Sequence, residues 1–131
     1  MSVVLAAPAR SLITAGLTAT AVAAAATSGI AAAGGSAGIG LEVGGAPVPP
    51  SGFAVLTVVF SLAGLVLALV LARTARRPRT AFVRATIVLT ALSLVPDALV
   101  DADSATKALM MVTHLVAAAV VIPAIARRLA A

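Results

Sequence analysis

The chain has 131 residues, of which 62% are hydrophobic and only 10% are charged, and its formal net charge is +5. A soluble domain has about 25% charged residues, so this composition excludes an ordinary water-soluble domain and indicates helices that face lipid. The absence of Cys excludes disulfides, thiolate metal sites and cysteine nucleophiles, and the basic residues cluster between apolar runs, so we expect no nucleic-acid partner.

Four segments are long and apolar enough, or nearly so, to cross a bilayer as helices, which takes about 20 residues. They cover residues 11–33, 53–72, 81–100 and 105–126. The third segment reaches this length only if its helix continues through Pro96 to about Val100. We therefore predict an all-α integral membrane four-helix bundle, with residues 1–131 forming one domain.

The first segment, residues 11–33, is rich in Ala, Thr and Gly. Its small residues share one helix face, which we predict to be a close-packing surface: Thr14, Thr18, Ala21, Ala25 and Ser28. The alternative interpretation of residues 1–33 is a cleaved signal peptide. The apolar run is longer than the about 7–15 residues typical of such a peptide, which favours an uncleaved first span.

Residues 34–52 form a Gly/Pro-rich outer loop between the first and second helices, with seven of the ten glycines and three of the seven prolines. Apolar and non-apolar residues alternate over residues 39–44, which predicts a short extended segment. The loop could cap the outer mouth of the bundle or be a plain linker, and the sequence leaves both open. Glu42 in this loop is a candidate pocket residue, although a solvated loop acid is the simpler interpretation.

The charges predict the orientation of the four helices. Eight arginines fall on one side of the arrangement: Arg10, Arg73, Arg76, Arg77, Arg79, Arg84, Arg127 and Arg128. The other side carries Glu42, Asp97, Asp101, Asp103 and Lys107. The positive-inside rule then predicts a multi-pass protein of the cytoplasmic (inner) membrane with both termini in the cytoplasm. The lipid bilayer is its first expected partner.

The third segment contains a polar stripe at helix-face spacing, with intervals of four, three, four and four residues. Its members are Thr86, Thr90, Ser93, Asp97 and Asp101. Pro96 interrupts this helix because it lacks a backbone N–H, and a membrane helix tolerates such a proline when a nearby hydroxyl or water satisfies the freed carbonyl. Ser93 or Thr90 could supply that hydroxyl.

The only histidine, His114, lies about midway through the apolar run of residues 108–126. An ionisable side chain at this depth is costly and is a functional-site candidate by default. Lys107, Met111 and His114 share one helix face. If the third and fourth helices form a hairpin, the polar residues make one column, with Asp101 and Lys107 outermost, Asp97 level with Met111, and Ser93 and His114 deepest.

This column supports several functions, which the sequence alone does not separate. Our first hypothesis is a small binding or accessory module with an outward-facing polar pocket around His114. The second is a membrane-embedded enzyme that isomerises or cyclises a lipophilic substrate, with His114, Asp97 and Ser93 as catalytic residues. The third is an oligomeric transporter or proton pathway. The simplest alternative is a purely structural role, in which the same side chains only form interhelical hydrogen bonds.

The hypotheses share a set of pocket residues and partners. The expected pocket residues are Asp101, Lys107, Thr90, Met111 and Glu42. The expected partners are a lipophilic small molecule and either further copies of the chain or a larger membrane complex. No cofactor or metal is expected, because one His without Cys makes a poor ligand set.

Three segments of the sequence resemble a known family: LEVGGAPVPPSGFAVLTVVFSLAGL (41–65), RRPRTAFVRATIVLTALSLVPDAL (76–99) and ATKALMMVTHLVAAAVVIPAIARRL (105–129). The family comprises small four-span membrane proteins of actinobacteria and is described as a domain of unknown function. The resemblance implies four helices and an uncleaved first span, and it carries no established activity or cofactor. Ser93, Pro96, His114 and Pro123 match its signature positions, whereas Asp97 falls outside that set.

Overall fold

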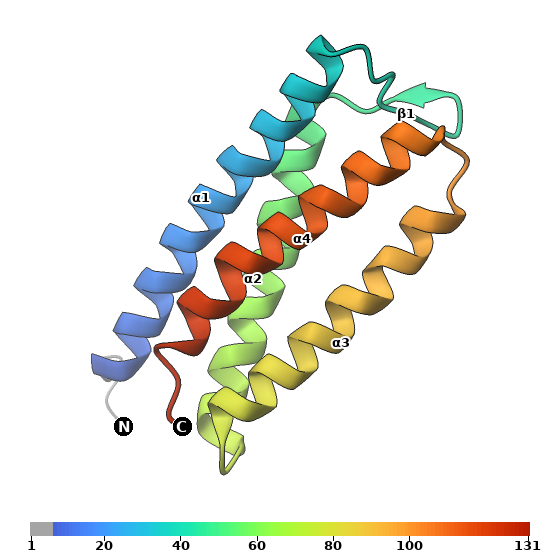
Figure 1. Ribbon diagram of the computed structural model, residues 1–131. Coiled ribbons are helices and arrows are strands. Elements are labelled where there is room, and N and C mark those ends of the chain that lie inside the picture. Colours follow the sequence, from blue (N-terminus) through green and yellow to red (C-terminus); the bar gives the residue numbers. More distant parts are fainter. Residues whose placement is uncertain (1–6) are drawn as a thin grey trace.

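The computed structural model describes residues 7–131, which form an antiparallel bundle of four helices (Figure 1). The helices are α1 (Ala7–Ser36), α2 (Pro50–Thr74), α3 (Pro78–Leu99) and α4 (Ser104–Ala126). Each is long and apolar enough to span a membrane. The predicted all-α membrane bundle is therefore confirmed for the described residues. Residues 1–6 of the predicted single domain lie outside the described part, and the domain assignment stays a prediction.

Local sequence signals account for where the helices begin and end. Pro50 and Pro78 stand in the first turns of α2 and α3, where a missing backbone N–H costs nothing. Asp103 caps α4, because its Oδ1 accepts a 2.7 Å hydrogen bond from the Thr106 backbone N–H. Helix α3 continues through Pro96 and ends at Leu99, so the longer form of the third span is confirmed.

The antiparallel arrangement gives the bundle two chemically different ends. The start of α1, the α2–α3 connection and the C-terminal tail lie together (Figure 1). We call this the arginine-rich end, because all eight arginines lie at it or within about two helical turns of it. The opposite end contains the loop between α1 and α2 and the α3–α4 connection. We call it the acidic end, because Glu42, Asp101 and Asp103 lie there.

Helix α1 packs closely against α2 and α4. A Cβ added at Gly16 would lie 2.6 Å from Leu65 Cδ1, and one at Gly34 would lie 2.8 Å from Leu109 Cδ1. These glycines therefore allow the helices to approach. The predicted packing face of α1 was wrong: four of its members are exposed and one is half-buried, namely Thr14, Thr18, Ala21, Ala25 and Ser28. The buried face is rotated and includes Ala19, Ala23 and Ala31.

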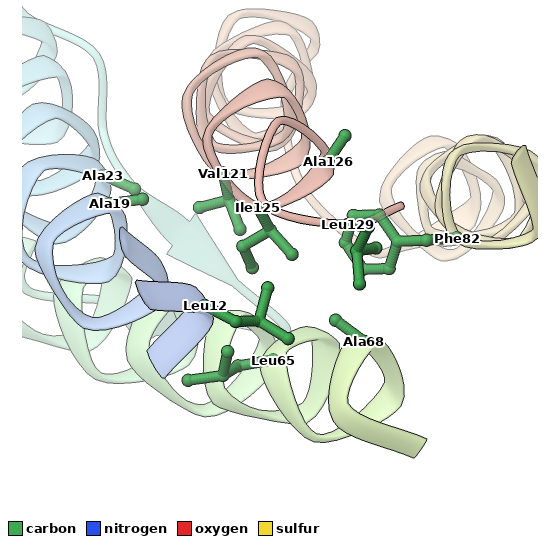
Figure 2. Packing of buried hydrophobic residues seen from close by; sticks show 10 residues of the cluster. All are labelled: Leu12, Ala19, Ala23, Leu65, Ala68, Phe82, Val121, Ile125, Ala126 and Leu129. Carbon is green, nitrogen blue, oxygen red and sulfur yellow. The ribbon is translucent and has the colours of Figure 1, made fainter. Parts of the chain in front are cut away.

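The main hydrophobic core lies toward the arginine-rich end and joins all four helices (Figure 2). Its buried members are Leu12, Ala19, Ala23, Leu65, Ala68, Phe82, Val121, Ile125, Ala126 and Leu129. Phe82, which is fully buried, is the one member from α3. Leu129 comes from the tail that follows α4, so the tail is part of the packed structure.

The outer loop contains a small antiparallel hairpin of β1 (Glu42–Val43) and β2 (Ala46–Pro47). Its turn residues, Gly44 and Gly45, both have positive φ, at 61° and 79°, as a tight two-residue hairpin turn requires. The Gly44 backbone N–H donates to the Asp101 carbonyl at 2.7 Å. This bond joins the hairpin to the α3–α4 connection, so the loop reaches across the acidic end and behaves as a cap.

Candidate functional site

Asp97 on α3 and His114 on α4 are in direct contact. Asp97 Oδ2 lies 2.6 Å from His114 Nδ1. It is the one ion pair between side chains of residues 7–131. The sequence placed both residues in one polar column without showing that they touch, and the structure brings them together across the α3–α4 interface.

The contact depends on an axial offset between α3 and α4. In Figure 1 the α3–α4 connection extends along the bundle beyond the end of α3 before α4 begins. Asp97 is two residues from the end of α3, or about 3 Å of helix, whereas His114 is ten residues into α4, or about 15 Å. The offset brings these two positions to the same level. The hairpin predicted from the sequence placed Asp97 level with Met111, about one turn short of His114.

The two partners are buried to different extents. The Asp97 side chain is 7% exposed and the His114 side chain 35% exposed. His114 Nδ1 is itself buried, so the exposed part of the ring belongs to its other atoms, which include Nε2. The distance is short, yet the pair lacks the alignment of a hydrogen bond, so it is a close contact between a carboxyl group and an imidazole. Asp97 holds one edge of the imidazole and leaves the opposite edge accessible.

The Ser93 and Thr90 hydroxyl groups, which precede Asp97 on α3, form hydrogen bonds within their own helix. Ser93 Oγ donates to the Thr90 carbonyl at 2.6 Å, and Thr90 Oγ1 donates to the Thr86 carbonyl at 2.7 Å. Neither hydroxyl satisfies the carbonyl freed by Pro96, so that prediction was wrong. Ser93 and Thr90 share the predicted face, but their hydroxyl protons are directed at α3 rather than at His114.

The outermost predicted residues hold the ends of the helices. Lys107 Nζ donates to the Ala98 carbonyl at 3.0 Å, near the C-terminus of α3, where a cation interacts favourably with the helix dipole. The exposed Asp101 contributes its backbone carbonyl to the bond from Gly44. Met111 is half-buried one turn from His114, and Glu42 is exposed in β1.

Two of the cavities formed by residues 7–131 lie elsewhere in the bundle, and neither is lined by Asp97 or His114. One, of about 420 Å³, is an apolar groove between α3 and α4. Its lining includes Thr90 and Leu94 on α3, and Leu115 and Ala118 on α4. The groove therefore begins about one turn from His114, on the side toward the arginine-rich end. The other, of about 520 Å³, lies at that end itself. Within residues 7–131 no group of three His, Cys, Asp or Glu side chains could hold a metal ion.

Two polar contacts were not anticipated from the sequence. Arg79 Nε donates to the carbonyls of Ala126 and Leu129, at 2.9 and 3.2 Å. These acceptors are main-chain atoms about 50 residues away, and no side-chain pattern could reveal them. The second is the Asp103 cap, for which the sequence does contain a signal, because an Asp immediately before the start of an apolar helix favours capping. Its bond to the Thr106 backbone N–H lowers the pKa of the Asp103 carboxyl.

Residues 7–131 match a family described as a family of unknown function (DUF6069), and the chain belongs to this family. Comparisons with curated proteins and with solved structures find no match. The match covers all four helices, the hairpin and the Asp97–His114 pair. Any role for these residues must therefore be argued from their geometry.

Proposed function

We propose that this member of the DUF6069 family is a small binding or accessory module of the cytoplasmic membrane that holds the polar group of a lipophilic small molecule at His114. In this proposal His114 makes the polar contact with the ligand. Asp97 is a positioning residue that fixes the orientation of the ring. The chain is a multi-pass membrane protein of uncharacterised activity.

The proposal rests on the uneven burial of the Asp97–His114 pair. A pair that served only to hold two helices together would gain most if both partners were enclosed. Here Asp97 is buried while about a third of the imidazole is exposed. Placing two ionisable groups in a membrane span is costly, and interhelical polar contacts average only about 0.6 kcal/mol. The exposed ring edge suggests that the cost is offset by a function.

The chemistry of the exposed edge limits the ligand class. With Nδ1 facing the carboxylate, Nε2 accepts a hydrogen bond when the imidazole is neutral and donates one when it is charged. A hydroxyl, carbonyl or carboxyl group suits such a site. The apolar groove that begins one turn away, next to Leu94 and Ala118, is suited to a hydrocarbon chain. A lipophilic molecule with one polar group fits both features.

The charge distribution supports the orientation. All eight arginines lie toward one end, and the positive-inside rule assigns that end to the cytoplasm. The acidic end then faces outward, and Asp97 lies about 3 Å from the outer end of α3. We propose outward access to the pair. The actinobacterial resemblance of the sequence agrees with a cytoplasmic membrane location.

Photolabelling of purified protein in lipid nanodiscs tests the proposed site. The probes are a photoactivatable fatty alcohol and a photoactivatable fatty acid, with the crosslinked peptide identified by mass spectrometry. We expect labelling on α3 or α4 near His114, reduced at least about tenfold by His114→Ala. The matched control is Met111→Ala, one turn away on the same helix. Equal labelling of all three proteins, or none near His114, would overturn the proposal.

A second candidate function is acid–base catalysis on a lipophilic substrate. It is favoured by the short Asp97–His114 distance, since a carboxylate that orients an imidazole is a common arrangement in general acid–base sites. The neighbouring Ser93 hydroxyl donates to its own helix, which leaves His114 as the main reactive group. A bound probe recovered with a shifted double bond or a new ring, with loss of that product in His114→Ala, would favour catalysis over binding.

A proton pathway has less support. A relay needs polar groups that continue from the pair toward the other side of the membrane. The hydroxyls of Thr86, Thr90 and Ser93 donate to carbonyls of their own helix, and the groove beside them is almost wholly apolar. Proton flux in proteoliposomes that disappears in His114→Ala would revive this alternative.

A further inference from the structure

The cavity at the arginine-rich end combines an apolar interior with two positive charges. It has a volume of about 520 Å³, within the range of about 300–1,000 Å³ that is typical of ligand pockets. Leu12 on α1 and Leu69 on α2 belong to its apolar lining, and Arg73 and Arg128 also line it. Leu12 and Leu129, which are nearly fully buried, form part of its floor. A ligand for this cavity would need both a hydrocarbon part and a negative charge.

The tail that follows α4 helps to build this cavity. The Arg79 backbone N–H donates to the Ala130 carbonyl at 3.0 Å, and Arg79 Nε binds the Ala126 and Leu129 carbonyls. These bonds fix the tail against the start of α3. Arg128 and Leu129 are thereby held beside α1 and α2. One wall of the cavity is therefore the tail itself, which these hydrogen bonds and the buried Leu129 hold in place. The other walls include the surfaces of α1 and α2.

Arg73 and Arg128 have no acidic partner at this end. Every Asp and Glu of the chain lies toward the acidic end, and among residues 7–131 neither guanidinium takes part in an ion pair. Both side chains are exposed. Guanidinium groups bind phosphate through paired N–H donors, and basic pockets between membrane helices on the cytoplasmic side bind anionic lipid head groups.

We propose that this cavity is a binding site for an anionic phospholipid. One acyl chain occupies the apolar interior along Leu12 and Leu69, and the phosphate lies between Arg73 and Arg128. The two arginines select an anion, and the apolar interior selects a lipid over a free phosphate ion, which has no part that fits it. The site is independent of the pair at Asp97 and His114, which belongs to the other half of the bundle.

The test uses the full chain in mixed micelles of phosphatidylglycerol and phosphatidylcholine, with bound lipid counted by native mass spectrometry. We expect selective retention of phosphatidylglycerol. Because the proposed site places both guanidinium groups that line the cavity against the lipid phosphate, Arg73→Gln/Arg128→Gln should weaken phosphatidylglycerol binding by about tenfold or more. The matched control, Arg76→Gln/Arg127→Gln, removes the same charge from residues outside the cavity and should change binding by less than about twofold.

A second pair of variants tests the apolar interior without altering charge. Val70 lines the cavity and is half exposed, whereas Val59 is similarly exposed on α2 and lies outside it. Val70→Phe should reduce phosphatidylglycerol retention at least about fivefold, and Val59→Phe should not. Both substitutions add an aromatic ring at an exposed position of one helix, so folding should be affected equally.

Three outcomes would overturn the proposal. The control arginine pair could weaken binding as much as the lining pair, which would indicate general surface attraction. Val70→Phe and Val59→Phe could have equal effects, which would place the acyl chain elsewhere. Glycerol phosphate, the head group without chains, could displace the lipid when added in large excess, which would point to a free phosphate site. Selective loss in the two lining variants, without displacement by glycerol phosphate, would support it.

Discussion

Helices α1 and α3 are joined to the bundle by different kinds of contact. Helix α1 lies against both α2 and α4 and buries small residues along most of its length, including Gly16, Ala23 and Gly34. Helix α3 lies mainly against α4 and buries only Pro78, Phe82 and Asp97.

The polar contacts that α3 makes with the rest of the bundle are concentrated at its two ends. Arg79 binds the C-terminal tail at one end. At the other, Asp97 contacts His114 and the Ala98 carbonyl accepts from Lys107. This difference between α1 and α3 follows from the lipid environment of the bundle. Apolar burial gives little driving force for helix association in lipid. Close packing therefore holds α1 in the bundle, and polar contacts hold α3.

The largest effect is expected where the close packing of α1 is broken. Gly16→Leu should lower the free energy of unfolding by about 1–3 kcal/mol, because even a Cβ would overlap the buried Leu65 side chain. Gly29→Leu on the same helix is the control, since nothing lies within 4 Å of its Cβ position. Unfolding in detergent, followed by circular dichroism, measures both. Leu65→Ala should partly rescue Gly16→Leu, and an equal loss at Gly29 would contradict the close-packing account.

A smaller effect is expected where the polar contact of α3 is broken. Interhelical polar contacts in membranes average about 0.6 kcal/mol and reach about 1.7 kcal/mol. We expect the coupling between Asp97→Asn and His114→Gln to fall in this range, because both partners belong to one contact. A double-mutant cycle on the unfolding free energy measures it. A coupling near zero would mean that the pair contributes nothing to the attachment of α3 and would leave only its proposed binding role.

At the other end of α3, loss of the Arg79 side chain should cost about 0.5–1 kcal/mol, the value of a hydrogen bond at a partly exposed site. Arg79→Ala leaves the Ala126 and Leu129 carbonyls without their side-chain donor. Hydrogen exchange should rise in the tail after α4 and stay unchanged around Gly34. Arg79→Lys keeps the charge but has no N–H at the Nε position that donates both bonds, so it should recover only part of the protection. Full recovery would mean that charge alone fixes the tail.

The smallest effect is expected from the cap of α4, which lies outside the spans. The Thr106 backbone N–H lowers the pKa of Asp103 below its usual value of 3.8. A carboxyl whose pKa is lowered on folding stabilises the fold above that usual value, and the contribution disappears as the pH falls through the lowered pKa. Amide exchange near Thr106 should therefore increase in acid. Asp103→Asn keeps an acceptor without a titrating group, and its exchange should lack this acid-dependent step.

The sequence predicted much of the fold and less of the candidate site. The four helices could be predicted because a helix that spans a bilayer needs a long apolar run. Pro50, Pro78 and the Gly/Pro-rich loop mark their limits. His114 and Asp97 could be predicted as candidate site residues because ionisable groups are rare in such apolar runs. Their contact could not be derived, since it depends on how far α4 is displaced along α3, and helix-face spacing does not contain that displacement.

The rotation of α1 shows the same limit. Its small residues occur on every face, and in lipid there is no contrast between an apolar interior and a polar exterior to select one of them. Spacing alone favours the face centred on Thr18 and Ala21, yet this face is exposed. The face that includes Gly16 and Ala23 is buried because it is complementary in shape to Leu65 and its neighbours, a property of two helices together.

The sequence by itself determined the number of helices, their approximate limits and the separation of arginines from acids, because these depend on the bilayer and on the order of residues along one chain. Only the tertiary structure decided which face of α1 is buried, that Asp97 meets His114, and that Arg79 folds the tail over α3. Those outcomes depend on the rotation and axial offset of whole helices. Packing and main-chain hydrogen bonds set both, and neither leaves a periodic signal in the sequence.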